Sequence, residues 1–176
     1  MSNIIDKYNV SVPRYTSYPP ANYFHELEAS DYLEAVVRSN EEGSKKLSFY
    51  LHMPFCKRLC HYCGCNSYIM PSSGDTVAKY IDAIHKEIDL VTALIDKSRP
   101  ISQIHFGGGS PTAMPSSVLK EINEHLLSLF PTIDKPEIAI ECHPGYLTEE
   151  DWINLTNSHF NRFSIGIQDL DDKVLK

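Results

Sequence analysis

Apolar residues follow two alternating rhythms along most of the chain. Four short runs have the apolar and aromatic composition of strands. Between them lie longer segments whose apolar positions recur every three or four residues, which predicts helices. The resulting order is β-α-β-α-β-α-β, the order of a parallel sheet with helical crossovers. The predicted strands are residues 46–53, 103–106, 137–141 and 162–168.

Three helices are predicted between these strands, and an amphipathic segment precedes them. The first crossover helix carries apolar positions over residues 77–94, and the second over 118–129. An amphipathic segment near residues 30–39 lies before the first strand. The predicted N-terminal caps are Asp75 or Thr76 for the first crossover helix and Thr148, in a capping box with Asp151, for the third.

The alternation predicts an α/β fold, specifically a partial (β/α) barrel with parallel strands and crossover helices. Four strands do not close a barrel, so we expect the chain to be truncated after about the fourth strand, which would leave an apolar edge. We divide the chain into an N-terminal extension, residues 1–45, and a barrel portion, residues 46–176. Barrels of this type carry their sites at the C-terminal ends of the strands. Each predicted strand here ends in unusual residues: a cysteine loop, three glycines, Glu141 and Gln168.

Charge and hydropathy exclude some classes of function. The formal net charge is −7, which argues against a general nucleic-acid binder, because such proteins neutralise phosphates with basic patches. No run of about 18 apolar residues is present, so no membrane span is expected. The N-terminus is polar, is interrupted by prolines and lacks the apolar core of a signal peptide. We therefore expect a cytoplasmic protein.

The cysteines are unevenly distributed. Four of the five fall within ten residues, and the fifth, Cys142, lies far away in the sequence. In a reducing cytosol such crowding indicates metal binding or catalysis rather than disulfides. We expect Cys142 to be a small buried residue.

The spacing of the crowded cysteines, C-x3-C-x2-C, suits three corners of a cubane iron–sulfur cluster and leaves the fourth iron without a protein ligand. Ferredoxins use four cysteines at other spacings. Zinc is the alternative, with His61 or Cys65 as a fourth ligand. Lys57 and Arg58 are expected to lower the thiol pKa values. We therefore predict an open 4Fe–4S cluster, with Cys56, Cys60 and Cys63 as its ligands.

Four blocks of sequence carry a wider resemblance: KYNVSVPRYTSYPP (7–20), FYLHMPFCKRLCHYCGCN (49–66), HFGGGSPT (105–112) and NRFSIGIQD (161–169). Together they resemble the radical S-adenosylmethionine superfamily and, within it, the oxygen-independent coproporphyrinogen III oxidases, also called dehydrogenases. The resemblance runs nearly the length of the chain but covers well under half of such an enzyme, and it implies the N-terminal part of a radical SAM barrel.

The resemblance implies an oxidoreductase of haem and porphyrin biosynthesis. In that family a 5′-deoxyadenosyl radical, formed from cluster-bound S-adenosylmethionine, abstracts hydrogen from coproporphyrinogen III, which becomes protoporphyrinogen IX without oxygen. The implied cofactors are a 4Fe–4S cluster and two S-adenosylmethionine molecules, and an electron donor is needed. Arg14 is one candidate to bind the acidic substrate. We expect the chain by itself to be inactive. The alternatives are a haem-handling or haem-degrading radical enzyme on the same scaffold and a non-enzymatic metal-binding module.

The resemblance also implies two groups of cofactor-binding residues, and it assigns no catalytic residue. Glycines at a strand end permit close approach of the backbone, and a carboxylate ending an apolar strand needs a partner, for which ribose hydroxyls are suitable. A tight turn, a salt bridge at the barrel rim or ordinary packing are the alternatives. The cluster-bound cofactor would contact Tyr50, Gly108 and Glu141, and the second would contact Tyr62, Gly109, Ser110 and Gln168.

Three further positions are noted. His52 shares a strand face with Tyr50 and is a candidate polar partner near the reaction centre, and Cys65 is expected near the cluster without binding it. The segment ECHP has His143 where the family more usually has aspartate, which leaves the role of position 143 in doubt. The remaining histidines are expected to be surface or structural residues.

Overall fold

A computed structural model describes residues 4–9, 21–171 and 173 of the protein. The chain divides into two compact units, residues 1–35 and 36–176. The division at residues 45 and 46 stays a prediction, and Arg14 lies outside the described residues. The predicted amphipathic segment is a helix that begins in the first unit and ends in the second. The elements up to this point are α1 (Ile4–Tyr8), the short 3-10 helix η1 (Ala21–Tyr23) and α2 (Ala29–Glu42).

The second unit is built on a four-stranded sheet in the order β1-β4-β5-β6. All three neighbouring pairs are parallel, as the alternation of strands and helices predicted. β4 and β5 are longer than the predicted apolar runs, β1 begins one residue later than predicted, and β6 is shorter. Their bounds are β1 (Leu47–Met53), β4 (Ile101–Gly108), β5 (Thr132–Cys142) and β6 (Arg162–Ile165).

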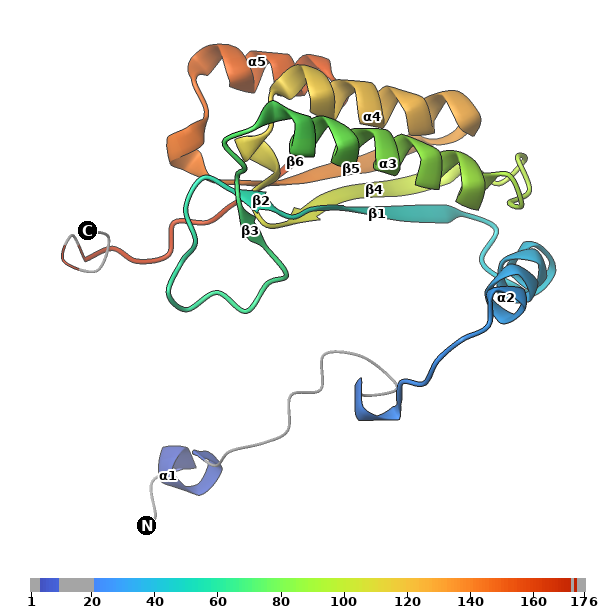
Figure 1. Ribbon diagram of the computed structural model, residues 1–176, viewed down its shortest axis with the longest axis horizontal. Helices are drawn as coiled ribbons and strands as arrows, with labels where there is room; N and C mark the ends of the chain where they lie inside the picture. The colour runs from blue at the N-terminus through green and yellow to red at the C-terminus, as the bar shows by residue number, and fades with distance from the viewer. Residues whose placement is uncertain (1–3, 10–20, 172, 174–176) are drawn as a thin grey trace. The chain divides into compact units, whose positions relative to one another are not determined.

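Three crossover helices cover one face of this sheet: α3 (Gly74–Thr92), α4 (Ser116–Leu129) and α5 (Glu149–Asn157) (Figure 1). Alternate strand residues meet the apolar sides of the helices and form the core. Within the described ranges, no helix is long and apolar enough to cross a membrane. The largest fully buried side chains of the core include Met53, Ile104, Phe106, Leu119, Ile122 and Ile140.

The helix caps agree with the sequence in one case and differ in another. Thr148 and Asp151 form the predicted capping box at the start of α5. The cap of α3 was predicted wrongly, because it is Ser73, whose Oγ accepts a hydrogen bond from the backbone N–H of Asp75. The helix therefore begins at Gly74, and Asp75 and Thr76 lie within its first turn.

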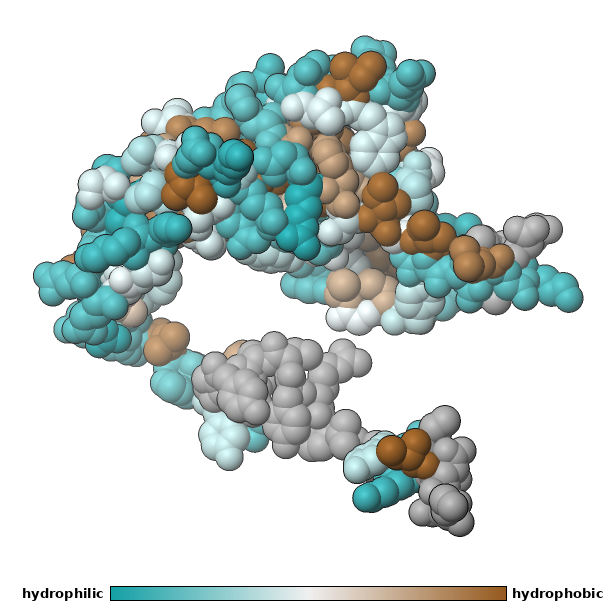
Figure 2. Space-filling view, turned by 180° about the vertical axis from the view of Figure 1, so that it is seen from behind, coloured by the Kyte–Doolittle hydropathy of each residue, from teal (hydrophilic) through white to brown (hydrophobic). Residues whose placement is uncertain are grey.

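β6 is the edge strand and ends earlier than predicted. It stops at Ile165, and Gln168 has φ 71°, a left-handed conformation that does not continue a strand. Ile165, Ile167 and Leu170 are exposed, and Figure 2 shows hydrophobic side chains in a row toward this end of the chain. Of these three residues only Ile165 belongs to β6, so the exposed apolar side chains lie mainly beyond the edge strand rather than along it.

The other face of the sheet is polar. By strand register, Tyr50 on β1 lies opposite His105 on β4, and Gln103 on β4 lies opposite Glu137 on β5. Gln103 Nε2 donates to Glu137 Oε1 at 2.6 Å, and Arg162 Nη1 donates to Glu137 Oε2 at 2.7 Å. These pairings stabilise charged groups on a face that the described helices α3, α4 and α5 do not cover.

One buried hydrogen bond between helices predicts a stability effect. Asn123 on α4 is fully buried, and its Nδ2 donates to the carbonyl oxygen of Ser158 at 2.9 Å. Asn123→Ala leaves that carbonyl without its partner, so we expect the free energy of unfolding to fall by about 1–3 kcal/mol. Urea denaturation followed by circular dichroism measures the change.

The matched control is Asn157→Ala, which makes the same replacement at an exposed position of α5. Its free energy of unfolding should stay within about 0.5 kcal/mol of the unchanged protein. Equal losses in the two variants would contradict the stabilising role of the Asn123 hydrogen bond.

Candidate functional site

The cysteine loop is closed at its base by a pair of short strands that the sequence did not predict. β2 (Phe55–Cys56) and β3 (Tyr68–Ile69) pair in parallel, and the N–H of Met70 donates to the carbonyl of Cys56 at 2.8 Å. Cys56 is buried at this base, whereas Cys60, Cys63 and Cys65 are exposed on the loop. Figure 1 shows the loop on the side of the sheet away from the crossover helices. All the cysteines are free thiols.

Hydrogen bonds within the loop distinguish two of its thiols. The backbone N–H of Cys65 donates to Cys63 Sγ at 3.4 Å, which lowers the pKa of Cys63. A side-chain hydrogen bond with Cys63, and then burial, raise the pKa of Cys65. Lys57 was expected to act on the thiols, but its Nζ lies 4.7 Å from the centre of the Tyr146 ring. The main causes at Cys63 are therefore local hydrogen bonds, and they favour a thiolate at Cys63 over one at Cys65.

Three cysteines of this loop can supply the thiolates of a 4Fe–4S cluster. In the part of the chain that the structure describes, no three His, Cys, Asp or Glu side chains gather as the ligands of one metal ion do. A 4Fe–4S cluster binds each thiolate at a different iron, so its ligands need not meet at one point. Three thiols on one short loop, two of them exposed, are suitable donors for such a cluster.

The last two residues of β4, Gly107 and Gly108, are glycines because side chains from the neighbouring strands lie close to them. Gly108 has φ 111°, and a Cβ there would lie 2.6 Å from the ring of His52. A Cβ at Gly107 would lie 3.0 Å from both Glu141 Oε1 and the ring of Tyr50. Tyr50 on β1 and Glu141 on β5 can therefore approach each other, because β4 carries no side chain between them.

Gly109 allows the cysteine loop to approach the end of β4. Its N–H donates to the carbonyl of Met53 at 2.8 Å, and the N–H of Ser110 donates to the carbonyl of Phe55 at 3.0 Å. A Cβ at Gly109 would lie 3.0 Å from Cys56 Sγ. The glycine at residue 109 thus permits close contact between the end of β4 and the start of the cysteine loop.

A chain of hydrogen bonds joins the cysteine loop to Tyr50. His52 Nε2 lies 2.8 Å from the carbonyl oxygen of Asn66, so it must donate, and in the neutral imidazole Nδ1 is then an acceptor. Tyr50 Oη lies 3.1 Å from that Nδ1 and donates to it. Burial, and then the charge of Glu141, raise the pKa of Tyr50 and keep its proton on this bond. Because its proton is used in this bond, the hydroxyl oxygen of Tyr50 can only accept a further hydrogen bond.

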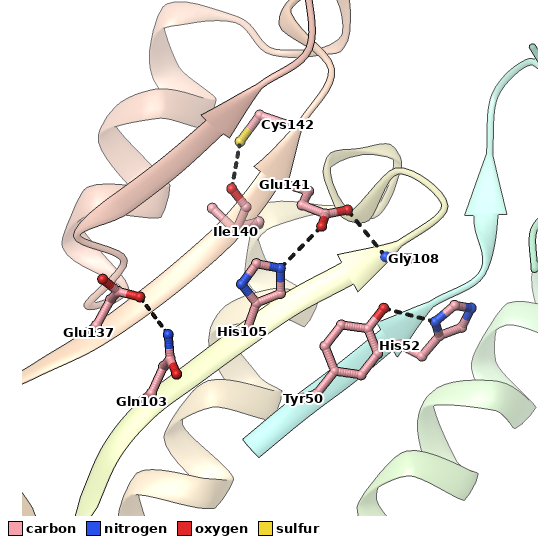
Figure 3. A network of polar contacts seen from close by, with 9 residues as sticks. All are labelled: Tyr50, His52, Gln103, His105, Gly108, Glu137, Ile140, Glu141 and Cys142. Atoms are coloured by element: carbon pink, nitrogen blue, oxygen red, sulfur yellow. Dashed lines mark hydrogen bonds and ion pairs between the residues drawn. The ribbon is translucent and has the colours of Figure 1, made fainter. Parts of the chain in front are cut away.

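Glu141 and His105 meet on the polar face (Figure 3). Glu141 Oε1 lies 3.2 Å from His105 Nε2, and Glu141 Oε2 accepts from the N–H of Gly108 at 3.3 Å. The three residues predicted for the cluster-bound cofactor, Tyr50, Gly108 and Glu141, are therefore brought together. His105 was not singled out from the sequence and was expected to be structural. Its position two residues before Gly107, hence on the same strand face, was the available indication.

Two residues predicted for the second cofactor are also in contact. Tyr62 Oη donates to Gln168 Oε1 at 2.9 Å across 106 positions of sequence. His143 stacks on Tyr146, with ring centres 3.9 Å apart, and borders the same pocket. Gly109 and Ser110 are not among the described residues that line it. The pocket has a volume of about 720 Å³ and is lined by Tyr62, His143, Pro144, Gly166, Ile167, Gln168 and Asp169.

Cys142 takes no part in these contacts. Its side chain is buried, and its Sγ donates to the carbonyl of Ile140 at 3.7 Å. Burial, with a smaller effect of the neighbouring charge of Glu141, raises the pKa of Cys142 to about 11. The thiol stays protonated at neutral pH, and the prediction of a buried structural cysteine is confirmed.

Curated proteins named oxygen-independent coproporphyrinogen III oxidase are similar to nearly the whole chain. The one from Synechocystis sp. is 37% identical over 174 residues, which are 98% of this chain and 37% of that protein. The one from Escherichia coli K12 is 38% identical over 172 residues, 97% of this chain and 36% of its own length. The chain thus spans well under half the length of these relatives.

A solved structure and a family profile agree with these similarities. Coproporphyrinogen III oxidase HemN from Escherichia coli, described as a radical SAM enzyme, superposes with a TM-score of 0.83 at 34% identity. The superposition covers 97% of this chain and 37% of that one, and it is consistent with a partial radical SAM barrel. The profile of the Radical SAM superfamily matches residues 50–176, which include the cysteine loop, the glycines and Glu141. The chain therefore belongs to the radical SAM superfamily.

Proposed function

We propose that this chain forms part of an enzyme that converts coproporphyrinogen III to protoporphyrinogen IX without oxygen, in haem and porphyrin biosynthesis. The observation that carries the proposal is the meeting of the cysteine loop, Gly108 and Glu141 at the C-terminal ends of β1, β4 and β5. The similarity of 97–98% of the chain to proteins named for this reaction supports the substrate. A cytoplasmic location fits this proposal.

The radical SAM superfamily uses a 4Fe–4S cluster and S-adenosylmethionine. In this chain Cys56, Cys60 and Cys63 would hold the cluster. When bound, the cluster supplies the electron that cleaves S-adenosylmethionine, and that electron comes from a separate donor. The strand pair β2–β3 holds the base of the loop, where Cys56 is buried, and Cys60 and Cys63 are exposed on the loop and would be accessible to the cluster.

The two groups of contacting residues support two cofactor positions. Tyr50, Gly108 and Glu141 would orient the cluster-bound S-adenosylmethionine, with Glu141 accepting hydrogen bonds from its ribose. Tyr62 and Gln168 line the 720 Å³ pocket, which would receive a second S-adenosylmethionine. Gly109 and Ser110 directly follow Gly108 and would also contact the second molecule. Their N–H groups already donate to backbone carbonyls, so the contact would be made through their other atoms.

The proposed reaction changes two propionate side chains of the substrate into vinyl groups. Each loses carbon dioxide, a hydrogen atom and one further electron, so an acceptor for that electron is needed. The role of the chain is to orient the reactants and to keep water from the reacting carbon.

A chimeric enzyme tests the function directly. This chain would replace the matching part of the Escherichia coli relative, which is 38% identical to it. After anaerobic reconstitution, we expect the chimera, given reductant and S-adenosylmethionine, to form protoporphyrinogen IX from coproporphyrinogen III, measured by chromatography of the oxidised porphyrins. A chimera with intact cluster that consumes haem but leaves coproporphyrinogen unchanged would replace this proposal by the haem-degrading alternative.

The cluster ligands can be tested on the chain itself. After anaerobic reconstitution with iron and sulfide, Cys60→Ala and Cys63→Ala should lose the 4Fe–4S cluster, because each removes one of three thiolate ligands. Iron content and electron paramagnetic resonance measure the loss, and added S-adenosylmethionine should change the spectrum of the unaltered chain. The matched control is Cys65→Ala, in the same exposed loop, which should keep its iron. If Cys65 proves as necessary as the others, the site is a closed four-ligand centre.

Glu141 can be tested through cofactor affinity. Glu141→Ala removes a carboxylate that accepts from ribose hydroxyls, and each charge-assisted hydrogen bond lost should cost roughly 1.5–3 kcal/mol. Isothermal titration of the reconstituted chain with S-adenosylmethionine measures the dissociation constant. Glu137→Ala removes the same charge from the same strand and face but from the Arg162 pair, and should bind normally. An unchanged dissociation constant in Glu141→Ala would mean that Glu141 does not bind the cofactor and serves only its contacts with His105 and Gly108.

A further inference from the structure

His105 occupies the centre of the polar face, between two residues of the site. It lies on β4, opposite Tyr50 on β1 and opposite Ala139 on β5. Its ring is stacked with that of Tyr50, with ring centres 5.8 Å apart and planes inclined by 18°. The small side chain of Ala139 leaves the ring free to extend toward Glu141, one position further along the same face of β5 (Figure 3).

The hydrogen bonds of Glu141 leave a defined set of acceptor positions. An ionised carboxylate is only an acceptor, so His105 Nε2 must donate to Oε1 across the 3.2 Å that separates them. The N–H of Gly108 donates to Oε2. Each carboxylate oxygen accepts two hydrogen bonds, so one acceptor position remains on each oxygen. Two adjacent acceptors match the two adjacent hydroxyls of a ribose.

The neighbouring carboxylate on β5 has donors of its own. Glu137 accepts from Arg162 Nη1 at 2.7 Å and from Gln103 Nε2 at 2.6 Å, whereas the hydrogen bond of His105 goes to Glu141. Hydrogen bonds from these two residues lower the pKa of Glu137. His105 is thus paired with Glu141 by both position and chemistry.

We propose that His105 is a positioning residue that holds the Glu141 carboxylate in the orientation that accepts both ribose hydroxyls of an adenosyl cofactor. The proposal rests on the proposed function, since it assigns the ribose to Glu141. Without the Nε2–H donor, the Glu141 side chain can rotate about its terminal torsion and present a single oxygen. His105 therefore acts on recognition of the ribose and not on the cluster.

The test compares two ligands, S-adenosylmethionine and its 2′-deoxyadenosyl analogue, by isothermal titration of the reconstituted chain without reductant. The unaltered chain should prefer S-adenosylmethionine by about tenfold, the worth of one charge-assisted hydrogen bond. His105→Leu should lose most of that preference and approach Glu141→Ala. His105→Gln keeps an amide donor of similar reach and should retain much of it, whereas the shorter His105→Asn should not.

Gln103→Leu is the matched control, because it removes a donor from the same face of β4 that contacts Glu137 instead of Glu141. Its preference should equal that of the unaltered chain. A merely structural role for His105 would weaken both ligands equally, and an unchanged ratio in His105→Leu and His105→Asn overturns the proposal. If the unaltered chain, with its cluster, binds neither ligand or does not distinguish them, the ribose role of Glu141 fails and this inference with it.

Discussion

Two backbone hydrogen bonds at the ends of β1 and β4 hold the site together. The N–H groups of Gly109 and Ser110 donate to the carbonyls of Met53 and Phe55, and so continue the pairing of the two strands beyond the sheet. This pairing places the start of the cysteine loop beside the glycines, with Cys56 Sγ only 3.0 Å from where a Cβ at residue 109 would lie. The positions of Cys56, Tyr50 and Gly108 are therefore set by the same strand pair.

The two faces of the sheet meet different demands. The helix-covered face contains the core, and its alternate apolar residues need only exclude water. Parallel sheets are normally covered on both faces, yet the second face here carries Tyr50, His105 and the Glu137–Arg162 pair. Because each carboxylate on it has hydrogen-bond donors, this face can stay polar and ordered, which suits the interior of a barrel that binds polar cofactors.

Local patterns predicted the fold well because the periodicity of apolar residues and a capping box depend on neighbours in sequence. The parallel order and the Thr148 cap belong to this class. The features that the sequence did not reveal depend on contacts between distant segments. The β2–β3 pair has two residues in each strand, too few for any periodicity, and His105 becomes a site residue only because β5 brings Glu141 beside it. Ser73, one of several capping residues near the start of α3, could not be distinguished locally from Asp75.

The end of β4 explains why side chains from β1 and β5, which are not adjacent strands, can form one site. Gly107 separates Tyr50 from Glu141, and a Cβ there would lie within 3.0 Å of both. Gly108 is similarly confined by the ring of His52, while its N–H donates to Glu141. Because Gly107 and Gly108 carry no side chains, only the backbone of β4 lies between the Tyr50–His52 network and the Glu141 network. One network reaches the cysteine loop through His52 and Asn66, and the other ends at the Glu141 carboxylate, so the glycines allow the network of the cysteine loop to approach that carboxylate.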